Sequence, residues 1–598
     1  MSESLYCRTC ANLKRVDQQQ YGFAVTFLSR AVTFVASLIL VGILPWLSGK
    51  DPALALLRAR SGEQEATPET LEAIRQSLGL DQGPFALLGR WFAGLLRGDA
   101  GNSWISGRPV LPGMLDATGV SLTLMGCAAA VAFTLALALC ASTFYRGLKG
   151  RPRQPGGVMA ALFTALPEFL LSSCLLIMGA VWLKWFPPYG WQGTQYAILP
   201  ALALGIPAGG YLGRILSDAL AATFREQWIL TWCVAGVSRR NIALAVTIRA
   251  VAGVLPLIGL VLVSLTGGAI AVEKVFAIPG LGRAILGASA AQDLPALQTG
   301  IVIILLLAML VGILATLLRA LIIGQALRHG AMPMPDINRQ YTGRDSKLSV
   351  AVCLLLIAVV LVAGAGRDPY VSQFARLQPP SLSLPFGADG MGRDLLARVA
   401  HGTMDTCITA LLVAVACLAI GLIAGLFSRL FTGPTEIANA LPPVVAGLLV
   451  AAIMGPGEAG ASIAVTAVSW APLAAHTAAL VAETHARPYI RMLPILGVGP
   501  VRRSLFYTLP AIAGPLFRHA MLRVPGIALS LSALGFLGLG ASPPLPEWGR
   551  LLAEGLPYTE RAYWVVLAPV SALIVLSVLA VSASSIPGAK SQGNSGGV

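Results

Sequence analysis

The stretches GVSRRNIALAVTIR (Gly236 to Arg249) and GVGPVRRSLFYTLP (Gly497 to Pro510) follow one pattern in two distant parts of the chain. Each begins with Gly-Val, carries an Arg-Arg pair a few residues later, and leads through a short amphipathic run into an apolar segment. The leading glycine permits a tight turn at a helix end. A motif that appears once in each half of the chain, as here at Gly236 and Gly497, predicts an internal repeat of the whole fold.

The composition is that of a membrane protein. Of the 598 residues, 56% are hydrophobic and only 12% are charged, and the mean hydropathy is +0.75. A soluble domain carries about 25% charged residues. A formal net charge of +15 could indicate a protein that binds nucleic acid. The basic residues are, however, dispersed in short loops between apolar runs. We therefore expect a multi-span protein surrounded by membrane lipid, with no nucleic-acid partner.

Twelve segments are long and apolar enough to cross a bilayer, whose core of about 30 Å requires about 20 residues of helix. The first six candidates are residues 31–47, 118–144, 158–183, 196–222, 251–277 and 298–326. The second six are residues 348–366, 404–428, 437–454, 460–482, 512–538 and 562–585. The segments 437–454 and 460–482 are the least distinct, because only MGPGEAG separates them.

The distribution of basic residues predicts the orientation. With a cytoplasmic N-terminus, and with the long loop 48–117 left out, Lys and Arg are more numerous in the cytoplasmic loops than in the external ones. Arg146, Lys149, Arg339 and Arg344 are examples of this bias. Because cytoplasmic loops are enriched in basic residues, we expect both the N-terminus and the C-terminus to be cytoplasmic.

These observations predict an all-α membrane protein of twelve transmembrane helices in two parallel six-helix halves. Since each half has an even number of spans, the second half starts with the orientation of the first, and a pseudo-two-fold axis along the membrane normal relates them. The first half covers residues 1–327 and includes the external loop 48–117. A cytoplasmic linker covers residues 328–347, and the second half covers residues 348–598.

The two repeated stretches both fall on the cytoplasmic side, between the fourth and fifth spans of their own half. Basic loops that merely obey the orientation bias are the simpler interpretation. Two copies at corresponding places favour a symmetric pair of docking surfaces instead. The candidate residues are Gly236, Arg239, Arg240, Gly497, Arg502 and Arg503.

Four longer stretches resemble the permease subunits of type I ABC importers, and most closely those of the peptide/nickel branch. The first two are similar to one subunit of that branch and the last two to its partner subunit. They are LGLDQGPFALLGRWFAGLLRGDAGNSWISGRPV (Leu78 to Val110), VEKVFAIPGLGRAIL (Val272 to Leu286), DPYVSQFARLQPPSLSLPFGADGMGRDLLARVAHG (Asp368 to Gly402) and ALGFLGLGASPPLPEWGRLLAEG (Ala533 to Gly555). The resemblance implies two type I ABC importer permease subunits fused in one chain.

The resemblance also implies partners and a location. Two ABC ATPase domains on separate chains would dock on the two repeated stretches, which act as coupling loops. An extracytoplasmic binding protein would deliver di/oligopeptides or related small solutes such as metal chelates. The chain would lie in the bacterial cytoplasmic (inner) membrane. It would hold no cofactor itself, with ATP and Mg bound by the partner ATPases.

The coupling loops depart from the family pattern. The family has an acidic residue and an Ala-Arg-Ala-like run before the glycine. This chain has Gln227 with WCV (232–234) in one copy, and Pro488 with LPI (493–495) in the other. We expect Pro494 to break a helix there, because proline lacks an N–H donor and clashes with the preceding turn.

An acidic residue within a predicted span is a candidate for the translocation path. Glu168 lies in ALPEFLL, inside the span 158–183. A charge at mid-bilayer costs about 2.5–3.5 kcal/mol, so we expect Glu168 to face the interior of the bundle or water. The alternative is a position near the membrane surface, set by Pro167, where the carboxylate is merely solvated.

Further candidates belong to the external end. The external loop carries TPETLEAIRQSLG, which predicts a helix capped by Thr67 with Pro68 as its first residue. This loop is expected either to contact a binding protein or to form a cap that stabilises the mouth. The candidates for the external mouth or for binding-protein contact are Arg283, Arg550, Asp389 and Arg393.

The sequence contains no sign of catalysis. It has no G-x-x-x-x-G-K-[ST] motif, so ATP hydrolysis is expected in partner subunits rather than in this chain. H-E-x-x-H and G-x-S-x-G are also absent, and the five histidines are not spaced as metal ligands. A twelve-span secondary transporter, which also has parallel halves, is the main alternative. An assembly or sensor protein built on the same fold is another.

Overall fold

The computed structural model describes residues 67–77, 83–150, 166–323 and 343–584, with the pair 163–164 and a few residues between 32 and 57. Within these ranges the regular secondary structure is helical, apart from three isolated bridges. The all-α prediction is therefore confirmed. The predicted first span 31–47 lies largely outside the described residues, and residues 328–342 of the predicted linker lie entirely outside them.

Among the described residues, the first half has two helices in the loop predicted to be external, followed by the membrane helices. The two loop helices are α4 (Pro68–Ser77) and α5 (Pro84–Leu96). The remaining elements are α6 (Val110–Leu148), α8 (Glu168–Leu175), the π-helix η2 (Leu176–Trp182), α9 (Gln195–Thr223), α10 (Gln227–Val234), α11 (Arg239–Val275), α12 (Leu281–Ala290) and α13 (Leu294–Ile323). The predicted cap of α4 is confirmed, since the Thr70 N–H donates to Thr67 Oγ1 at 3.3 Å.

The second half repeats this order with more interruptions. Its first elements are α14 (Gly343–Gly364), α15 (Leu395–Leu426), α16 (Ser428–Ala440), α17 (Pro443–Met454), α18 (Glu458–Ser469) and α19 (Ala471–Ala486). The others are α20 (Pro488–Met492), α21 (Pro500–Arg503), η4 (Ser504–Thr508), α22 (Leu509–Met521), α23 (Val524–Leu537), α24 (Trp548–Gly555), η5 (Leu556–Tyr558) and α25 (Trp564–Ser584). The helix α14 begins inside the segment expected to be linker.

Corresponding helices start at corresponding residues. The sequence LPE (166–168) places Pro167 before α8, and LPP (441–443) places Pro442 before α17. Proline suits a helix start because its fixed φ fits the first turn and its missing N–H would have no helical partner there. By order along the chain, α6 matches α15, α9 matches α18 with α19, α10 matches α20, and α12 matches α24.

Most predicted spans appear as apolar helices. Among the described residues, eight helices have the length and composition to cross a membrane, or up to nine if the bent pair of α16 and α17 counts as one span. Two further apolar helices, Glu168–Trp182 and Trp564–Leu579, are shorter. Two boundaries differ from the prediction. Helix α6 starts at Val110, earlier than the expected 118, and the expected span 437–454 is bent by 92° between α16 and α17.

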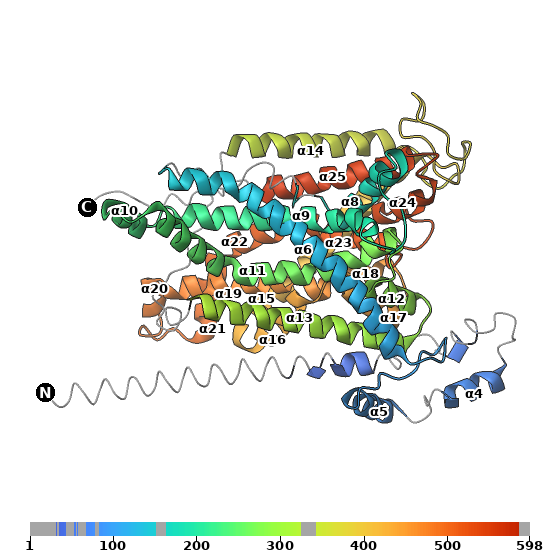
Figure 1. Ribbon diagram of the computed structural model, residues 1–598, viewed down its shortest axis with the longest axis horizontal. Coiled ribbons are helices and arrows are strands. Elements are labelled where there is room, and N and C mark those ends of the chain that lie inside the picture. Colours follow the sequence, from blue (N-terminus) through green and yellow to red (C-terminus); the bar gives the residue numbers. More distant parts are fainter. Residues whose placement is uncertain are drawn as a thin grey trace.

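Both halves run in the same direction through the bundle (Figure 1). The elements α10, α20 and α21 lie at one end, on the left of the view, and α12 and α24 lie at the other end. Helices α4 and α5, in the loop predicted to be external, also lie toward that second end, which we name the external end after that prediction. Elements that correspond between the halves therefore share an end, which confirms the parallel arrangement.

The two halves pack directly against each other. A Cβ atom added to Gly267 on α11 would lie 2.4 Å from the Cβ of Pro442, which precedes α17. Lys274 Nζ donates to the carbonyl oxygen of Phe536 at 3.0 Å, and the rings of Phe169 and Phe536 are 5.5 Å apart. Only a residue without a side chain fits at position 267, so a glycine there allows the backbones of the two halves to meet.

Candidate functional site

The first coupling element is a short helix closed by a glycine turn. Helix α10 ends at Val234, and the Val237 N–H donates to the Trp232 carbonyl at 3.0 Å. Gly236 adopts a φ of 73°, the left-handed conformation that glycine reaches without strain. Ser238 then caps the next helix, because its hydroxyl accepts from the Asn241 N–H at 3.4 Å. The chain therefore reverses sharply between α10 and α11.

The second coupling element makes the same turn after a shorter helix. Helix α20 ends at Met492, two residues before Pro494, as the break predicted from that proline requires. The Val498 N–H donates to the Leu493 carbonyl at 3.0 Å, and Gly497 has a φ of 78°. The two copies thus share their hydrogen-bond pattern although their sequences before the glycine differ.

Each coupling element exposes apolar side chains at matching positions. Val234 and Ile495, each two residues before the glycine, are 83% and 82% exposed. Leu244 and Leu505, each eight residues after it, are also exposed. Sequence reasoning selected the arginines and missed these residues, although a count from the two glycines would have found them. An apolar side chain left open at matching places in two copies is typical of a contact surface.

The candidate arginines of the two copies are not placed alike. Arg239, Arg240 and Arg502 are exposed and lie beside the apolar residues. Arg503 is half-buried, and its Nε has no hydrogen-bond partner among the described residues. We define the first coupling surface as Val234, Gly236, Arg239, Arg240 and Leu244, and the second as Ile495, Gly497, Arg502, Arg503 and Leu505.

Among the described residues, the first coupling surface is tied to its own bundle by a partly buried ion pair, whereas the Glu483–Arg487 pair beside the second surface is exposed. Arg249 Nε on α11 lies 2.6 Å from Glu226 Oε2, and Trp228 Nε1 donates to the same carboxylate at 2.6 Å. In the second half, the positions that correspond to Glu226 and Arg249 hold Arg487 and Pro510. The first surface is therefore anchored more firmly than the second.

At the external end of the first half, a buried carboxylate caps α12. Glu273, near the end of α11, accepts from the Arg283 N–H at 2.9 Å and from Ser121 Oγ at 2.5 Å. The Ser121 hydroxyl in turn accepts from the Leu281 N–H at 2.8 Å. The guanidinium of Arg283 donates to the Ala277 carbonyl at 2.6 Å. Arg283 therefore holds the loop before α12 while its side chain stays exposed.

The second half caps α24 in its own way. Glu547 immediately precedes the helix and accepts from the N–H groups of Gly549 and Arg550 at 2.8 and 3.0 Å. Burial raises the pKa of Glu547 to about 7, against the opposing effect of these hydrogen bonds. Arg550 Nη1 donates to the Ala541 carbonyl at 2.9 Å, so Arg550, like Arg283, holds the preceding loop.

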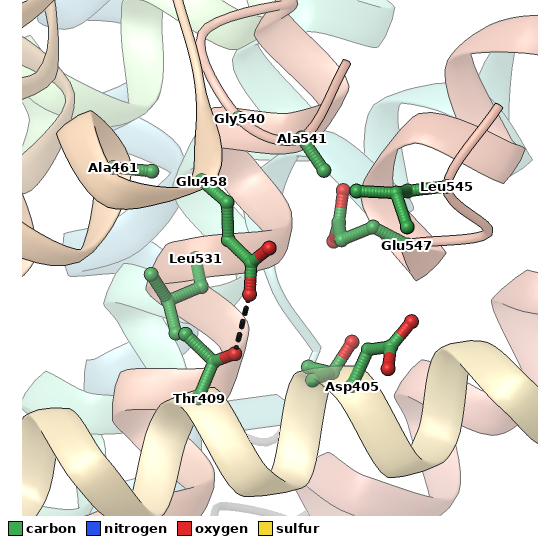
Figure 2. Close-up of a pocket in the computed structure, with 10 residues that line it drawn as sticks. Asp405, Thr409, Glu458, Ala461, Leu531, Gly540, Ala541, Leu545 and Glu547 are labelled. Atoms are coloured by element: carbon green, nitrogen blue, oxygen red, sulfur yellow. Dashed lines mark hydrogen bonds between the residues drawn. The ribbon is translucent and has the colours of Figure 1, made fainter. Parts of the chain in front are cut away.

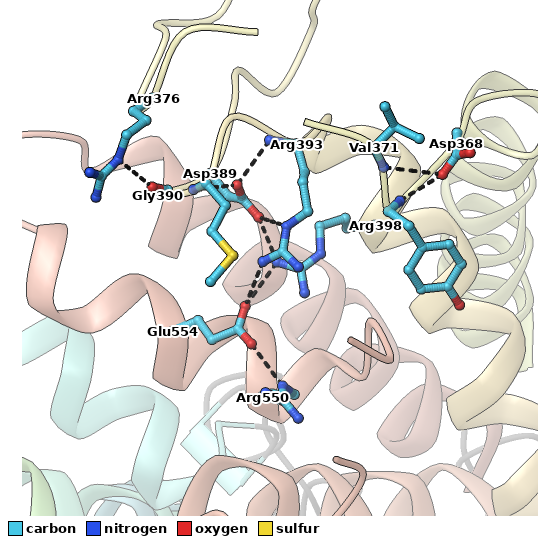
Figure 3. A network of polar contacts seen from close by, with 11 residues as sticks. Asp368, Val371, Arg376, Asp389, Gly390, Arg393, Arg398, Arg550 and Glu554 are labelled. Atoms are coloured by element: carbon cyan, nitrogen blue, oxygen red, sulfur yellow. Dashed lines mark hydrogen bonds and ion pairs between the residues drawn. The ribbon is translucent and has the colours of Figure 1, made fainter. Parts of the chain in front are cut away.

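Asp389 and Arg393 lie in a buried ion-pair network at the external end (Figure 3). Arg393 Nε is 2.7 Å from Asp389 Oδ2, and Arg398 Nη1 is 2.7 Å from that same oxygen. Arg398 also contacts Glu554 at 2.9 Å, and Arg550 contacts Glu554 at 2.7 Å. These contacts join the loop before α15 to α24. Contact of Asp389 or Arg393 with a binding protein stays a prediction.

The arginines change the acidity of the two carboxyl groups in this network. Burial by itself would raise the pKa of Asp389. The hydrogen bond from the Arg393 N–H and the charge of Arg398 outweigh burial and lower this pKa below its ordinary value. The pKa of Glu554 is lowered in the same way, mainly by Arg398 and Arg550 against the effect of burial. Both groups are therefore ionised at neutral pH.

A pocket beside α24 gathers three acidic residues (Figure 2). Asp405 on α15, Glu458 at the start of α18, and Glu547 line it, and Thr409 Oγ1 donates to Glu458 Oε1 at 2.8 Å. A second pocket, which contains Ser121 and Glu273, lies in the first half between α6, α11, α12 and α13. The pocket beside α24 is therefore lined by three acidic residues, and this second pocket is lined by one.

Glu168 is the first residue of α8 and lies against α11. A Cβ atom added to Gly268 would lie 3.3 Å from the carboxyl carbon of Glu168. The side chain is half-buried, and the next residue, Phe169, reaches Phe536 of the other half. Glu168 thus lies inside the bundle, next to the interface between the halves. A role in the translocation path stays a prediction.

This arrangement defines a class of protein: a membrane transport pore built from two related halves, with a matching pair of exposed patches at one end. The model of the family described as "binding-protein-dependent transport system inner membrane component" matches the chain twice, at residues 134–329 and 412–586. The chain belongs to this family. It is a permease component of the inner membrane, and the predicted fusion of two permease units is confirmed.

Similar curated proteins each align with less than half of the chain. The di/tripeptide transport system permease protein DppC of Pseudomonas aeruginosa is 38% identical over 268 residues, which cover 42% of this chain and 88% of the relative. The glutathione transport system permease protein GsiC of Salmonella paratyphi A is 30% identical over 302 residues, which cover 49% of this chain and 96% of the relative. A putative peptide transport system permease protein of Brucella abortus is 31% identical over 287 residues, covering 45% and 88%.

Proposed function

We propose that this chain is the transmembrane permease component of an ATP-driven importer for di/oligopeptides or related small solutes such as metal chelates. The relatives named for di/tripeptides, peptides and glutathione support peptides as the substrate class. The two permease units in one chain correspond to the two halves that such a pore requires. A secondary transporter is not favoured, because the family is one of binding-protein-dependent systems.

Energy enters through two ABC ATPase domains on separate chains, which bind ATP and Mg. The observation that carries this proposal is the pair of coupling surfaces at one end of the bundle, each with an open valine or isoleucine two residues before its glycine. Closure of the ATPase domains on ATP draws these surfaces together and tilts the helices behind them. This end and both termini are then cytoplasmic.

An extracytoplasmic binding protein delivers the solute at the opposite end. Helices α4 and α5 lie there, and α5 presents Phe85 and Leu96, which are 83% and 88% exposed. Trp104, further along the same external loop, is fixed to the membrane part because its N–H donates to Asp293 Oδ1 at 3.1 Å. Together with the exposed Arg283, these helices offer a surface for transient contact with the binding protein.

Uptake of a labelled dipeptide into cells or right-side-out vesicles, with and without the partner ATPases, tests this function. We expect uptake that requires ATP and both partners. Replacing Arg239, Arg240, Arg502 and Arg503 by Asp should abolish it. A matched control replaces Arg146 and Arg429 by Asp. Both arginines are exposed, and they are the last residues of the corresponding sequences FYR and FSR at the same end of the bundle. Uptake that persists without ATPases, or is equal in the quadruple variant and the wild type, contradicts the proposal.

A further inference from the structure

A cavity in the second half lies where three helices are interrupted. It is lined by the junction of α16 and α17, the junction of α18 and α19, and the start of α23. Its empty space is about 840 Å³, part of which is open to the surroundings. Interrupted helices are tolerated at membrane depth where the freed backbone lines a cavity, and transporters place substrate sites at such breaks.

Arg523 brings a positive charge to this cavity. It lies between α22 and α23, within the span Pro500–Leu537, and is half-buried. Its Nε has no hydrogen-bond partner, and no carboxylate among the described residues forms an ion pair with it. The ionisable groups that act on it electrostatically are Tyr211 and Cys417. Groups of these types carry no charge at neutral pH when unperturbed, since their ordinary pKa values are about 10 and 8.5.

The fold does not require this charge. Counted from the repeated glycines, position 523 corresponds to position 262, and the first half has a leucine there. An arginine in a membrane span is energetically costly and as a rule marks a solute pathway or has a named partner. Because the described residues supply no anionic partner for Arg523, we infer that a ligand supplies it.

The cavity borders the interface between the halves. Tyr211, which acts on Arg523, belongs to α9 of the first half. Pro443, which lines the cavity, holds the position that Glu168 holds in the first half. The Pro442 beside it approaches Gly267 of α11. A solute that passes between the two halves therefore comes within reach of this cavity.

We propose that Arg523 binds a carboxylate of the transported solute, which for a peptide is its free C-terminus. A guanidinium binds a carboxylate through charge-assisted hydrogen bonds, which are stronger than those between neutral groups. Asn439, Ser469 and Ser530 also line the cavity and supply further donors. This inference rests on the proposed function, and it narrows the substrate class to solutes with a free carboxylate.

The test compares uptake of a labelled dipeptide with that of its C-terminal amide, in cells that hold the same binding protein and ATPases. We expect Arg523→Gln to lower uptake of the free acid about tenfold, as for loss of a charge-assisted hydrogen bond, and to leave the slower uptake of the amide unchanged. Arg523→Lys, which keeps the charge, should retain most of the uptake. The matched control is Leu262→Gln, the corresponding position of the first half, which should not change the ratio of acid to amide uptake.

The outcomes separate the inference from the proposed function. Loss confined to the free acid, with recovery in Arg523→Lys, supports carboxylate binding. An unchanged ratio of acid to amide uptake in Arg523→Gln overturns carboxylate binding. An equal loss of uptake for both solutes in both arginine variants also overturns it, provided that size-exclusion chromatography shows both variants to be folded. If the wild type takes up neither solute under ATP, the proposed function fails instead.

Discussion

Glu273 and Glu547 perform the same task in the two halves from different places in the chain. Glu273 accepts from the Arg283 N–H at 2.9 Å, and Glu547 accepts from the Arg550 N–H at 3.0 Å. Counted from the repeated glycines, the position that corresponds to Glu273 is Leu534. The first N–H groups of a helix lack partners within it, so each short external helix needs an acceptor. The two halves supply this acceptor from different positions. This indicates that a fixed first turn of α12 and of α24, which contain Gly282-Arg283 and Gly549-Arg550, is important in both halves.

Glu547 should make the stability of the protein depend on pH near neutrality. Its pKa is raised to about 7 from an ordinary value of about 4.3, so its contribution to stability is fully present below the ordinary value and is lost as the pH rises through 7. We expect the unfolding temperature in detergent to fall between pH 5 and pH 8, and to fall less in Glu547→Gln. The exposed Glu560→Gln serves as the control. An identical pH profile for wild type and Glu547→Gln contradicts this assignment.

The ion-pair network around Arg398 should be a major source of stability at the external end. Arg398 is 1% exposed and contacts both Asp389 and Glu554. Arg398→Met leaves the buried Asp389 and the half-buried Glu554 with less compensation, and removal of one partner of a buried pair costs about 3–5 kcal/mol. We expect a clearly lower unfolding temperature for this variant. Arg376→Met, which loses only a hydrogen bond to the Gly390 carbonyl, should change it little.

The same network should make the protein acid-sensitive. The pKa of Asp389 is lowered in the folded state, so the stability that it contributes is present above the ordinary value of about 3.9 and is lost as the pH falls through the folded value. We expect the wild type to lose stability below about pH 4. Asp389→Asn should lose less over that range, as thermal unfolding between pH 5 and pH 3 will report. Parallel pH profiles for the two proteins would count against the network.

The exposed apolar residues of the coupling surfaces should matter as much as their arginines. Val234 and Ile495 are the matching, most open positions of the two surfaces. A carboxylate there places a charge where the ATPase partner buries an apolar group, and such contacts contribute most at the centre of an interface. We expect Val234→Asp or Ile495→Asp to lower ATP-dependent uptake at least tenfold without lowering the amount of folded protein.

The anchoring of the two surfaces gives that experiment an internal comparison. The first surface is tied to its bundle through Glu226 and Arg249, and the second has no corresponding pair. Glu226→Gln should therefore weaken coupling through the first surface only. The matched control is Glu483→Gln, which removes an exposed pair with Arg487. Normal uptake in all three surface variants would show that the partners dock elsewhere.

The sequence was sufficient for the architecture and insufficient for the polar contacts. The spacing of apolar runs and the repeated Gly-Val and Arg-Arg pattern predicted two parallel helical halves, because periodicity and turn chemistry are local properties. Pro494 likewise predicted the end of α20. The bend between α16 and α17 was missed, since its apolar residues alone read as one continuous span.

The pairing of distant charges was also beyond the sequence. Asp389 and Arg393 lie four residues apart and were expected at the external mouth. Their burial depends on Arg398 and on Glu554 of α24, which reach them only in the folded protein. Arg523 lies in the middle of the predicted span 512–538 and was not singled out from the sequence. Its meaning came from the cavity beside it and from Leu262 at the corresponding position.

Glu168 should select for the amino group of the solute if it lies on the translocation path. It is placed inside the bundle at the start of α8, next to the interface between the halves, and no arginine or lysine among the described residues forms an ion pair with it. A carboxylate there can accept hydrogen bonds from a peptide ammonium. We expect Glu168→Gln to lower uptake of a free dipeptide about tenfold and to leave uptake of its N-acetyl form unchanged. Asp116→Asn, which alters an exposed acid on α6, is the control. Equal uptake of the free dipeptide by Glu168→Gln and the wild type would place Glu168 off the path and leave only a structural role at the start of α8.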